Sequence, residues 1–349
     1  MVRKKSHPAK DEMKQKKLAK KRPAKSAGKR MLRVCMIGAG GRSVGVHYPS
    51  LRDAPGVKMT AVSDLDESRM HAAADQFGIP GRYANYVEMI EKEKPDAVYA
   101  ILPPHHLYDI AATVLDMRKN LIIEKPPGVK TEQARQLALL AKKKNVVTGV
   151  TFQRRYSPLI KKGKQLCEKK GPVHSAVATF YKNAVGGAPY YAGAIDILTC
   201  DAIHAVDTLR YLCGGEVVSV AADVRKLLSD FHTAHNALIR FSSGATGTLH
   251  TNWMTGRRIF SVEIHAPGIS FFGDPEEQGV LYADGDVNPK RTLNPFDLAK
   301  SKESYRAFGE YDMNLHFMDC IRKKKQPSSS LADAVKSMEL VDAIYDGQI

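Results

Sequence analysis

Cysteine is scarce in this sequence, and none of the five cysteines lies in a C-x-x-C pair. An odd number of widely spaced cysteines fits free thiols in a reducing compartment better than a disulfide framework. No segment is apolar over a length that could span a membrane, and no apolar region follows the N-terminal charges as it would in a secretory signal. We therefore expect a cytoplasmic protein with no membrane partner.

The signatures of several enzyme classes are missing as well. The sequence has no P-loop, no G-x-S-x-G nucleophile turn and no H-E-x-x-H metalloprotease helix. His232 and His235 are three residues apart, but no third ligand stands near them in the sequence, and a metal ion needs three or four. We predict that the protein binds no metal.

Acidic residues are almost absent from the first 30 residues, which hold 13 Lys/Arg against Asp11 and Glu12. This segment carries +11 of the net charge of +16, so the rest of the chain carries only +5. Because it has few apolar side chains to offset the entropy of ordering, we predict a disordered basic tail over residues 1–30. The charges come without aromatic residues or a nucleic-acid-binding motif, which favours a solvating tail over contact with nucleic acid.

What the sequence does contain begins with a glycine turn. Leu32–Ile37 has the composition of a buried strand, and a G-x-G-x-x-S run and an expected helix follow it directly. In this context glycines permit a tight turn and a close approach of the backbone to a pyrophosphate, which then lies at the helix N-terminus. The predicted phosphate-binding residues are Gly38, Gly40, Gly41, Arg42 and Ser43.

The second expected strand ends at Asp64, 26 residues after Gly38. A carboxylate at this place accepts hydrogen bonds from the adenosine ribose and repels a 2′-phosphate, which favours NAD over NADP. Asp66 is the better N-cap for the helix expected over 67–77, so Asp64 is predicted to remain available to the ribose. Arg42 keeps NADP open as the alternative, because a guanidinium near the adenine could accept a phosphate.

Strands and helices then alternate as far as Thr151, which predicts a doubly wound parallel sheet. Gly38, Asp64, Pro103 and Glu124 each follow the carboxyl end of an expected strand, so we expect them to converge on one crevice. After Thr151 the pattern changes to alternating strands with few crossover helices. The predicted fold class is α/β, with a basic tail at 1–30, a Rossmann domain at 31–151 and an α+β domain with an open, mainly antiparallel sheet at 152–349.

Asp201, His204 and Asp207 are spaced at three-residue steps in a segment expected to be helical, 198–212. Such steps keep side chains near one face of a helix. A histidine flanked by carboxylates could accept the proton of a substrate hydroxyl. A buried structural histidine remains the alternative.

Several segments together resemble the glucose–fructose oxidoreductase, inositol dehydrogenase and rhizopine-catabolism (Gfo/Idh/MocA) family. The resemblance covers nearly all of residues 31–349 and rests on VCMIGAGGRS, AVSDLDESR, DAVYAILPPHHLYDIA, LIIEKPPGVK, TFQRRYSP, DAIHAVDTLRYLCGG and the C-terminal segment that starts FMDCIRKKK. The most specific feature is the Glu-Lys-Pro run at 124–126 followed downstream by I-H-x-x-D at 203–207.

The resemblance implies a nicotinamide-dependent oxidoreductase that oxidises a ring hydroxyl, or reduces the matching ketone, mostly of sugars and polyols. It implies that Lys125 and His204 are catalytic, with His204 as the general acid/base. His106 would lie along the cofactor, Glu124 would position the nicotinamide ribose or Lys125, and Arg154 and Tyr156 would lie near the substrate.

One position departs from the family pattern. Many members carry an aspartate four residues before the catalytic histidine, where this chain has Cys200, and the nearest carboxylate is Asp201. A shift of one residue turns a side chain by about 100° around a helix, so Asp201 is not expected to orient His204 as the aspartate of the family does, which weakens an assignment of the chain to inositol dehydrogenase in particular. Asp201 and His204 are still predicted to contact the substrate.

The function predicted is therefore hydride transfer between NAD(P) and a carbon of a sugar, cyclitol or sugar derivative, by a homo-oligomer, dimer or tetramer. Arg154, Arg155 and the lysines near 161–170 would permit an acidic sugar, although a solvated helix explains the lysines equally well. The alternatives are a catalytically silent dinucleotide-binding regulator and a reductase of a non-sugar carbonyl or imine.

Overall fold

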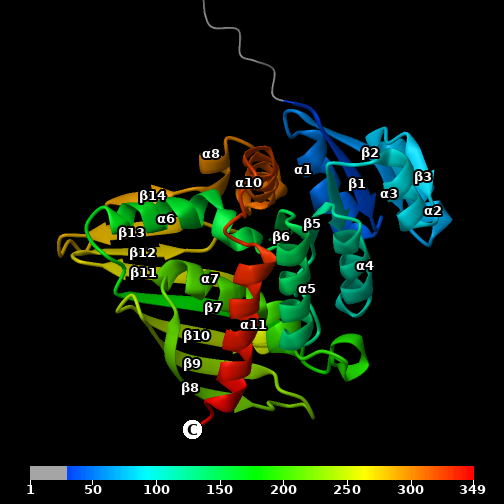
Figure 1. Cartoon of the computed structure of the whole chain (residues 1–349). Coiled ribbons are helices and arrows are strands. Elements are labelled where there is room, and N and C mark those ends of the chain that lie inside the picture. Colours follow the sequence, from blue (N-terminus) through cyan, green and yellow to red (C-terminus); the bar gives the residue numbers. More distant parts are fainter. Residues whose placement is uncertain (1–29) are drawn as a thin grey trace, which may run out of the picture. The chain divides into compact units, whose positions relative to one another are not determined.

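The computed structural model of the chain describes residues 30–349, so the predicted tail lies outside the described residues except for Arg30. Residues 32–349 form one compact unit. Two sheets organise it, and helices cover both faces of the first sheet (Figure 1).

The first sheet has six parallel strands in the order β3-β2-β1-β4-β5-β6. Its central strands are continuous apolar runs because both of their faces are buried. This order is that of a dinucleotide-binding fold, whose ligand crevice opens where the strand order reverses, between β1 and β4. The strands are β1 (Leu32–Ile37), β2 (Val57–Ser63), β3 (Gly81–Tyr83), β4 (Ala97–Ala100), β5 (Asn120–Ile123) and β6 (Thr148–Val150).

Two layers of helices sandwich this sheet. One face is covered by α3, α4 and α5, and the other by α1 and α2. Asp66 accepts a hydrogen bond from the Arg69 amide and caps α2, as the sequence predicts. The helices are the π-helical turn η1 (Ser43–His47), α1 (Tyr48–Arg52), α2 (Glu67–Phe77), α3 (Tyr86–Glu93), α4 (Pro104–Asp116) and α5 (Thr131–Lys144).

The second sheet has eight strands in the order β14-β13-β12-β11-β7-β10-β9-β8. All neighbours are antiparallel except β7 and β10, so the predicted mainly antiparallel sheet is confirmed. The sequence interpretation missed β13 and β14, which are short and flanked by Gly, Asp and Pro. The strands are β7 (Ser175–Asn183), β8 (Val217–Arg225), β9 (Ala234–Phe241), β10 (Thr246–Asn252), β11 (Met254–Ala266), β12 (Ile269–Gly273), β13 (Gly279–Ala283) and β14 (Arg291–Leu293).

Helices α6 and α7 pack on the second sheet, and α11 packs against α5, α7 and β8. The π-helical turn η4 leads directly into α7. The helical segments of this half are η2 (Gln153–Tyr156), α6 (Pro158–Glu168), η3 (Tyr190–Gly193), η4 (Leu198–Ala202), α7 (Ile203–Cys213), α8 (Pro295–Ala299), α9 (Ser304–Ala307), α10 (Glu310–Lys323) and α11 (Leu331–Asp346).

Helix α10 returns to the first sheet, although it lies near the C-terminal end of the chain (Figure 1). Phe317 packs edge-on against Tyr99 of β4, with ring centroids 6.0 Å apart, and the Tyr99 hydroxyl donates to Asn314 Oδ1 at 3.1 Å. The boundary expected between residues 151 and 152 stays a prediction, because the last two helices pack on elements from both sides of it.

Within residues 30–349, none of the helices combines the length and the apolar composition needed to cross a membrane.

Candidate active site

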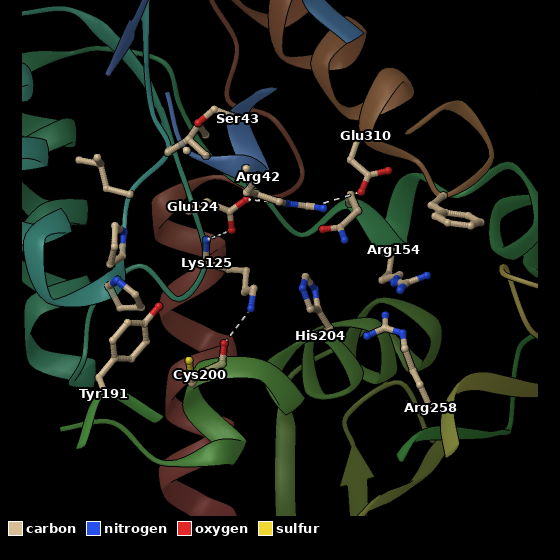
Figure 2. Close-up of a pocket in the computed structure, with 18 of the residues that line it drawn as sticks. Arg42, Ser43, Glu124, Lys125, Arg154, Tyr191, Cys200, His204, Arg258 and Glu310 are labelled. Carbon is tan, nitrogen blue, oxygen red and sulfur yellow. Dashed lines mark hydrogen bonds and ion pairs between the residues drawn. The ribbon is translucent and has the colours of Figure 1, made fainter. Parts of the chain in front are cut away.

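A cavity of about 670 Å³ lies at the carboxyl ends of β1, β4 and β5 (Figure 2). The first sheet contributes the glycine turn, the loop after β4 and the Glu124–Lys125 pair. The second half of the chain contributes residues of η2, η4, α7 and β11. A second cavity of about 550 Å³ shares Gly40, Ile101, Leu102 and Pro103 with the first and extends to Asp64 and His106. The two make one groove long enough for an extended ligand.

The glycine turn has one glycine that the fold requires and two that leave room for a ligand. Gly38 has φ +102°, and an added Cβ would collide with the carbonyl oxygen of Ile101. A Cβ added at Gly40 or Gly41 would meet no atom within 4 Å. This open space, at the start of a helix, fits the close approach of a dinucleotide pyrophosphate.

Polar atoms without partners gather around this cavity. Buried polar groups in proteins are normally hydrogen-bonded, so a cluster of orphaned ones indicates a place for a ligand or water. Among residues 30–349, five residues that line this cavity have a buried polar atom without a hydrogen-bond partner. They are Ser43 (Oγ), Gln153 (Oε1), Arg154 (Nε and Nη1), His204 (Nδ1) and Glu310 (Oε2).

Asp64 lies in the second cavity, but its oxygens are already bonded. Oδ2 accepts from the Ala39 amide at 2.7 Å, and Oδ1 accepts from the Asp66 amide and from Arg69 Nη2 at 3.0 Å. Burial raises its pKa, but these donors outweigh burial and lower the pKa overall. The turn and α2 thus both supply donors to Asp64, but three bonds leave a carboxylate further acceptor capacity, so its contact with a ribose stays a prediction.

His106 and Pro103 line the same second cavity as Asp64. The His106 ring lies 4.0 Å from that of His105, and His105 contacts Tyr191 edge-on at 5.1 Å. The structure thus brings the predicted cofactor residues of β1, β2 and β4 to one groove.

Glu124 is buried at the centre of a cluster of charged side chains. It lies 3.3 Å from both Arg42 Nε and His47 Nε2, and the second nitrogen of Arg42, Nη2, lies 3.1 Å from Glu310 Oε1. Burial raises the pKa of Glu124, but the hydrogen bond from His47 and the charge of Arg42 outweigh it, so the carboxyl is held ionised. Arg42 is therefore occupied by two carboxylates and does not line the cavity that holds Asp64, contrary to its expected place near the adenine.

Lys125 reaches across from the first sheet to η4. Its Nζ donates to the Cys200 carbonyl oxygen at 2.8 Å and lies 3.6 Å from Asp201 Oδ1. An ammonium has three donors, so the contact with Cys200 leaves others for a ligand oxygen.

His204 faces Lys125 across the cavity from α7 (Figure 2). It is 7% exposed, and its Nδ1 has no partner among residues 30–349. Burial and the nearby charges of Lys125 and Arg154 hold the pKa of His204 well below its usual range, so the ring is neutral at pH 7.

The two carboxylates expected to flank His204 point elsewhere. Asp201 pairs with Lys182 and accepts from the Tyr190 hydroxyl at 2.9 Å, and it does not line the cavity. Asp207 is buried in an ion pair with Arg155 and does not line the cavity either. The predicted common face is therefore wrong, and the π-helical turn over 198–202 changes the spacing further.

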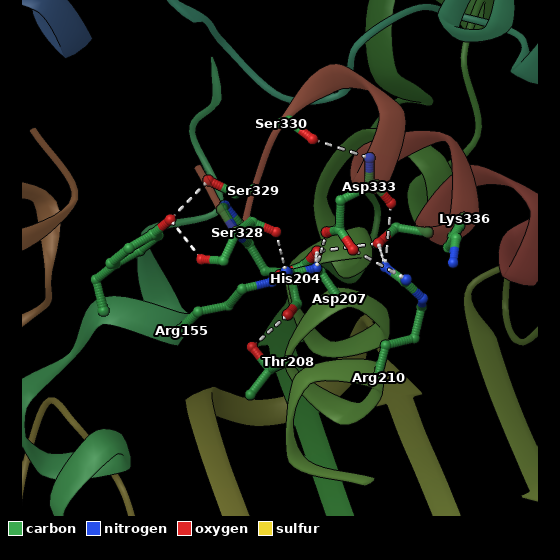
Figure 3. Close-up of polar contacts among 12 residues, drawn as sticks. Arg155, His204, Asp207, Thr208, Arg210, Ser328, Ser329, Ser330, Asp333 and Lys336 are labelled. Atoms are coloured by element: carbon green, nitrogen blue, oxygen red, sulfur yellow. Dashed lines mark hydrogen bonds and ion pairs between the residues drawn. The ribbon is translucent and has the colours of Figure 1, made fainter. Parts of the chain in front are cut away.

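Arg154 and Arg155 follow each other in η2 but lie in different environments. Arg154 lines the cavity, whereas Arg155 points toward α7 and α11. There Arg155 pairs with Asp207, with Nε 2.6 Å from Oδ2, and with Asp333 at 2.6 Å (Figure 3). Tyr156 also lies outside the cavity, because its hydroxyl bonds to Ser328 and Ser329 at 2.8 and 3.0 Å. The structure gives no support to Tyr156 as a substrate contact.

Sequence reasoning missed several residues that line the cavity. Arg258 on β11, Glu276 before β13, Glu310 at the start of α10 and Tyr191 in η3 come from separate elements. No motif joins them, so no sequence signal could have placed them beside Lys125.

Models of two protein domains match this chain. The model of an oxidoreductase family with an NAD-binding Rossmann fold, GFO/IDH/MocA, matches residues 32–152, and that of the GFO/IDH/MocA C-terminal domain matches residues 171–268. The chain belongs to this oxidoreductase family. The predicted family, fold class and nicotinamide cofactor are thereby confirmed.

Relatives of the GFO/IDH/MocA chain include two named sugar or cyclitol dehydrogenases. The chain is 27% identical over 304 residues to scyllo-inositol 2-dehydrogenase (NAD(+)) of Bacillus subtilis, covering 82% of this chain and 85% of the relative. It is 24% identical over 327 residues to D-xylose 1-dehydrogenase (NADP(+)) 2 of Haloferax volcanii, covering 89% and 95%.

Solved structures share the fold across nearly the whole chain. A dehydrogenase from Chromobacterium violaceum superposes with a TM-score of 0.81 at 20% identity, over 91% of this chain and 96% of that one. Levoglucosan dehydrogenase in complex with NADH and levoglucosan gives a TM-score of 0.77 at 21% identity, over 90% and 96%.

Proposed function

We propose that the protein is an NAD(P)-dependent dehydrogenase or reductase that acts on a CH–OH carbon of a sugar, cyclitol or sugar derivative. The observation that carries the proposal is the meeting of Lys125, from the first sheet, with His204, from α7, in a cavity that continues into the glycine turn. The named relatives, which act on inositol and xylose, supply the substrate class.

In the proposed reaction His204 is the base and Lys125 is the cation. A bound nicotinamide dinucleotide supplies the hydride acceptor or donor. In the oxidation direction His204, which burial keeps neutral, accepts the hydroxyl proton on a ring nitrogen. The Lys125 ammonium donates to the same oxygen and stabilises the negative charge that develops there.

The cofactor-binding roles of Gly38, Gly40, Gly41, Arg42, Ser43, Asp64, Pro103, His106 and Glu124 are part of this proposal. NAD is favoured over NADP because Asp64 places a carboxylate in the adenine half of the groove. NADP stays the alternative through Arg69, which lines the same cavity and pairs with Asp64 at 3.0 Å. Arg42 no longer supports NADP, since two carboxylates hold it.

A homo-oligomer is also part of the proposal. Pairing in the second sheet places Leu238, Thr248, Val177, Glu263 and Phe272 in one row across the face away from α6 and α7. Leu238 is 51% exposed and Phe272 38%, and exposed apolar side chains on a sheet face are typical of an interface. A molar mass in solution equal to one chain, 38.5 kDa, would exclude the oligomer.

The test compares cofactor binding with turnover. Thermal stability is followed while the cofactor-free protein is titrated with NAD⁺, NADH, NADP⁺ and NADPH, and NADH absorbance is then followed with sugars and cyclitols. We expect Lys125→Ala to reduce kcat by about 10²–10⁴-fold and to leave stabilisation by the dinucleotide nearly unchanged. The control is Lys130→Ala, at an exposed lysine outside the groove.

Normal turnover by Lys125→Ala would remove the lysine from the mechanism. Stabilisation of the wild-type protein by a dinucleotide without turnover of any sugar would favour the regulator or the non-sugar reductase.

A further inference from the structure

The part of the cavity that faces the second sheet carries an unusual set of charges. Arg154 and Arg258 both contact one carboxylate, Glu276, and all three residues line the cavity. Arg154 Nη2 lies 2.6 Å and Arg258 Nη2 2.9 Å from the same oxygen, Glu276 Oε1. The charges of Asp201 and Asp274 also act on Arg258 from a greater distance, but among residues 30–349 neither aspartate forms an ion pair with Arg154 or Arg258.

Arg154 is the buried member of this pair. Its side chain is 5% exposed, and Nε and Nη1 have no hydrogen-bond partner among residues 30–349. Burying a charged group with unused donors costs several kcal/mol unless a partner is supplied. A bound anion would supply it.

Both guanidinium groups lie over aromatic rings at cation–π distance. Arg154 lies 4.4 Å from the centroid of Phe260, and Arg258 lies 5.1 Å from that of Phe180. A cation–π contact restrains a guanidinium, and the bond to Glu276 restrains it further, so that its remaining N–H donors are held in place. Preorganised donors of this kind suit carboxylate and phosphate oxygens.

The arginine pair also lies at the right place relative to the reacting residues. Arg154 is close enough to His204 to contribute to its low pKa, and Figure 2 shows Arg154 and Arg258 on the side of His204 away from Ser43 and the glycine turn. A sugar with its hydroxyl between Lys125 and His204 would thus direct its far end toward the arginines.

We propose that the natural substrate of this site is an anionic sugar or cyclitol, whose carboxylate or phosphate is bound by Arg154 and Arg258. This inference rests on the proposed function. Arg155 has no part in this binding, because it pairs with Asp207 and Asp333 and does not line the cavity. The lysines of 161–170 do not line the cavity either.

The experiment uses neutral and charged members of one ring series. A hexose, the matching hexuronate and the matching hexose phosphate are compared by kcat/KM and by their equilibrium binding to the NADH-loaded protein. We expect one anionic member to exceed the hexose by about 10- to 100-fold in both measurements, the range of a hydrogen bond to a charged group. The carboxylate and phosphate arms identify which anion the arginines bind.

Arg258→Gln is expected to lower kcat/KM for the preferred anionic member about 10-fold more than it lowers kcat/KM for the neutral hexose, which removes most of this preference. Arg257→Gln is the matched control, because Arg257 is its neighbour on β11 but pairs with Glu277 and does not line the cavity. Arg154→Lys keeps a positive charge at the buried position. We expect it to lower the preference for the anionic member less than Arg258→Gln does.

Equal or better use of the hexose, or no binding of either anion by the NADH-loaded protein, would overturn the inference. Turnover of neutral sugars alone would leave the proposed function standing, whereas failure of every dinucleotide to bind would contradict the proposed function itself.

Discussion

At the scale of single residues, Asp201 lies near Lys125, and its charge also acts on His204, where it opposes the lowering of the pKa by burial. Its carboxylate lies 3.6 Å from Lys125 Nζ, pairs with Lys182, and accepts from Tyr190. Burial raises the pKa of Asp201, but the charges of Lys125 and Lys182 lower it by more than burial raises it. The carboxylate therefore stays ionised between the two ammonium groups. We therefore assign Asp201 as a positioning residue for Lys125.

Asp201→Asn should lower kcat by about tenfold with little change in KM, because the lysine loses a charged partner near the reacting oxygen. Steady-state kinetics with Asp201→Glu as the conservative variant and Asp223→Asn, at an exposed pair with Arg225, as the control measures this effect. An equal rise in KM at constant kcat would indicate direct substrate binding instead.

The sequence correctly placed at the crevice those residues that follow the end of a strand. It was less reliable for residues whose place depends on the direction of the side chain. Glu124 and Lys125 follow β5 directly, so the topology alone carries them to the crevice. Tyr156 failed to reach it because its direction depends on Ser328 and Ser329, far along the chain. Arg258 could not be found at all, because only the folded second sheet brings it beside Arg154.

At the scale of elements, the turn between β1 and η1 separates a folding requirement from a binding requirement. Gly38→Ala should lower the free energy of unfolding by about 1–3 kcal/mol. The alanine would have to adopt the positive φ of this position, and its Cβ would collide with the carbonyl oxygen of Ile101. Gly40→Ala has open space around the new methyl group and should unfold like the wild-type protein. It should instead raise the Kd for NAD at least about tenfold.

Urea unfolding together with calorimetric titration of NAD separates the two effects. Equal loss of stability in both variants would show that the space beside Gly40 is needed by the fold and not by the cofactor.

Elements with a strong local pattern were predicted almost to the residue. The bounds of β1 and α2 agree with the sequence expectation, because each combines a buried face with clear end signals. The two π-helical turns, η1 and η4, had no such signal. Both line the cavity, and irregular helical turns are frequent at functional sites because they redirect side chains.

At the scale of the whole molecule, the buried cluster of Arg155 links η2 to α7 and α11. Arg155→Met would leave the buried Asp207 without its ion-pair partner, while Asp333 would keep Arg210 at 3.3 Å, and should cost roughly 3–5 kcal/mol of unfolding free energy. Arg135, which pairs with Glu339 between α5 and α11 at the surface, is the matched control, and Arg135→Met should leave the urea midpoint nearly unchanged. Similar midpoints for the two variants would contradict a stabilising role of the buried cluster.

Acid stability depends on a second buried histidine, His235, which bonds to Thr251 and Tyr345. Burial lowers its pKa to about 4. Below pH 6.5 the unfolded chain takes up a proton that the folded chain does not, so stability falls as the pH drops toward 4, by about 3 kcal/mol from this group.

Urea unfolding at pH 7 and at pH 4.5 should therefore show a smaller pH-dependent loss for His235→Gln than for the wild-type protein. His250→Gln, at a half-buried histidine of the neighbouring strand, serves as the control. An unchanged pH dependence in His235→Gln would mean that other groups account for the acid sensitivity.

The return of α10 to the first sheet has a consequence for synthesis. During translation the strands and helices of residues 32–150 leave the ribosome first, but the face of β4 that carries Tyr99 is covered only when Phe317 arrives. The nucleotide-binding half therefore keeps an apolar surface uncovered until a helix near the end of the chain has been synthesised. The order in which this protein is made and the order in which it can finish folding are therefore different.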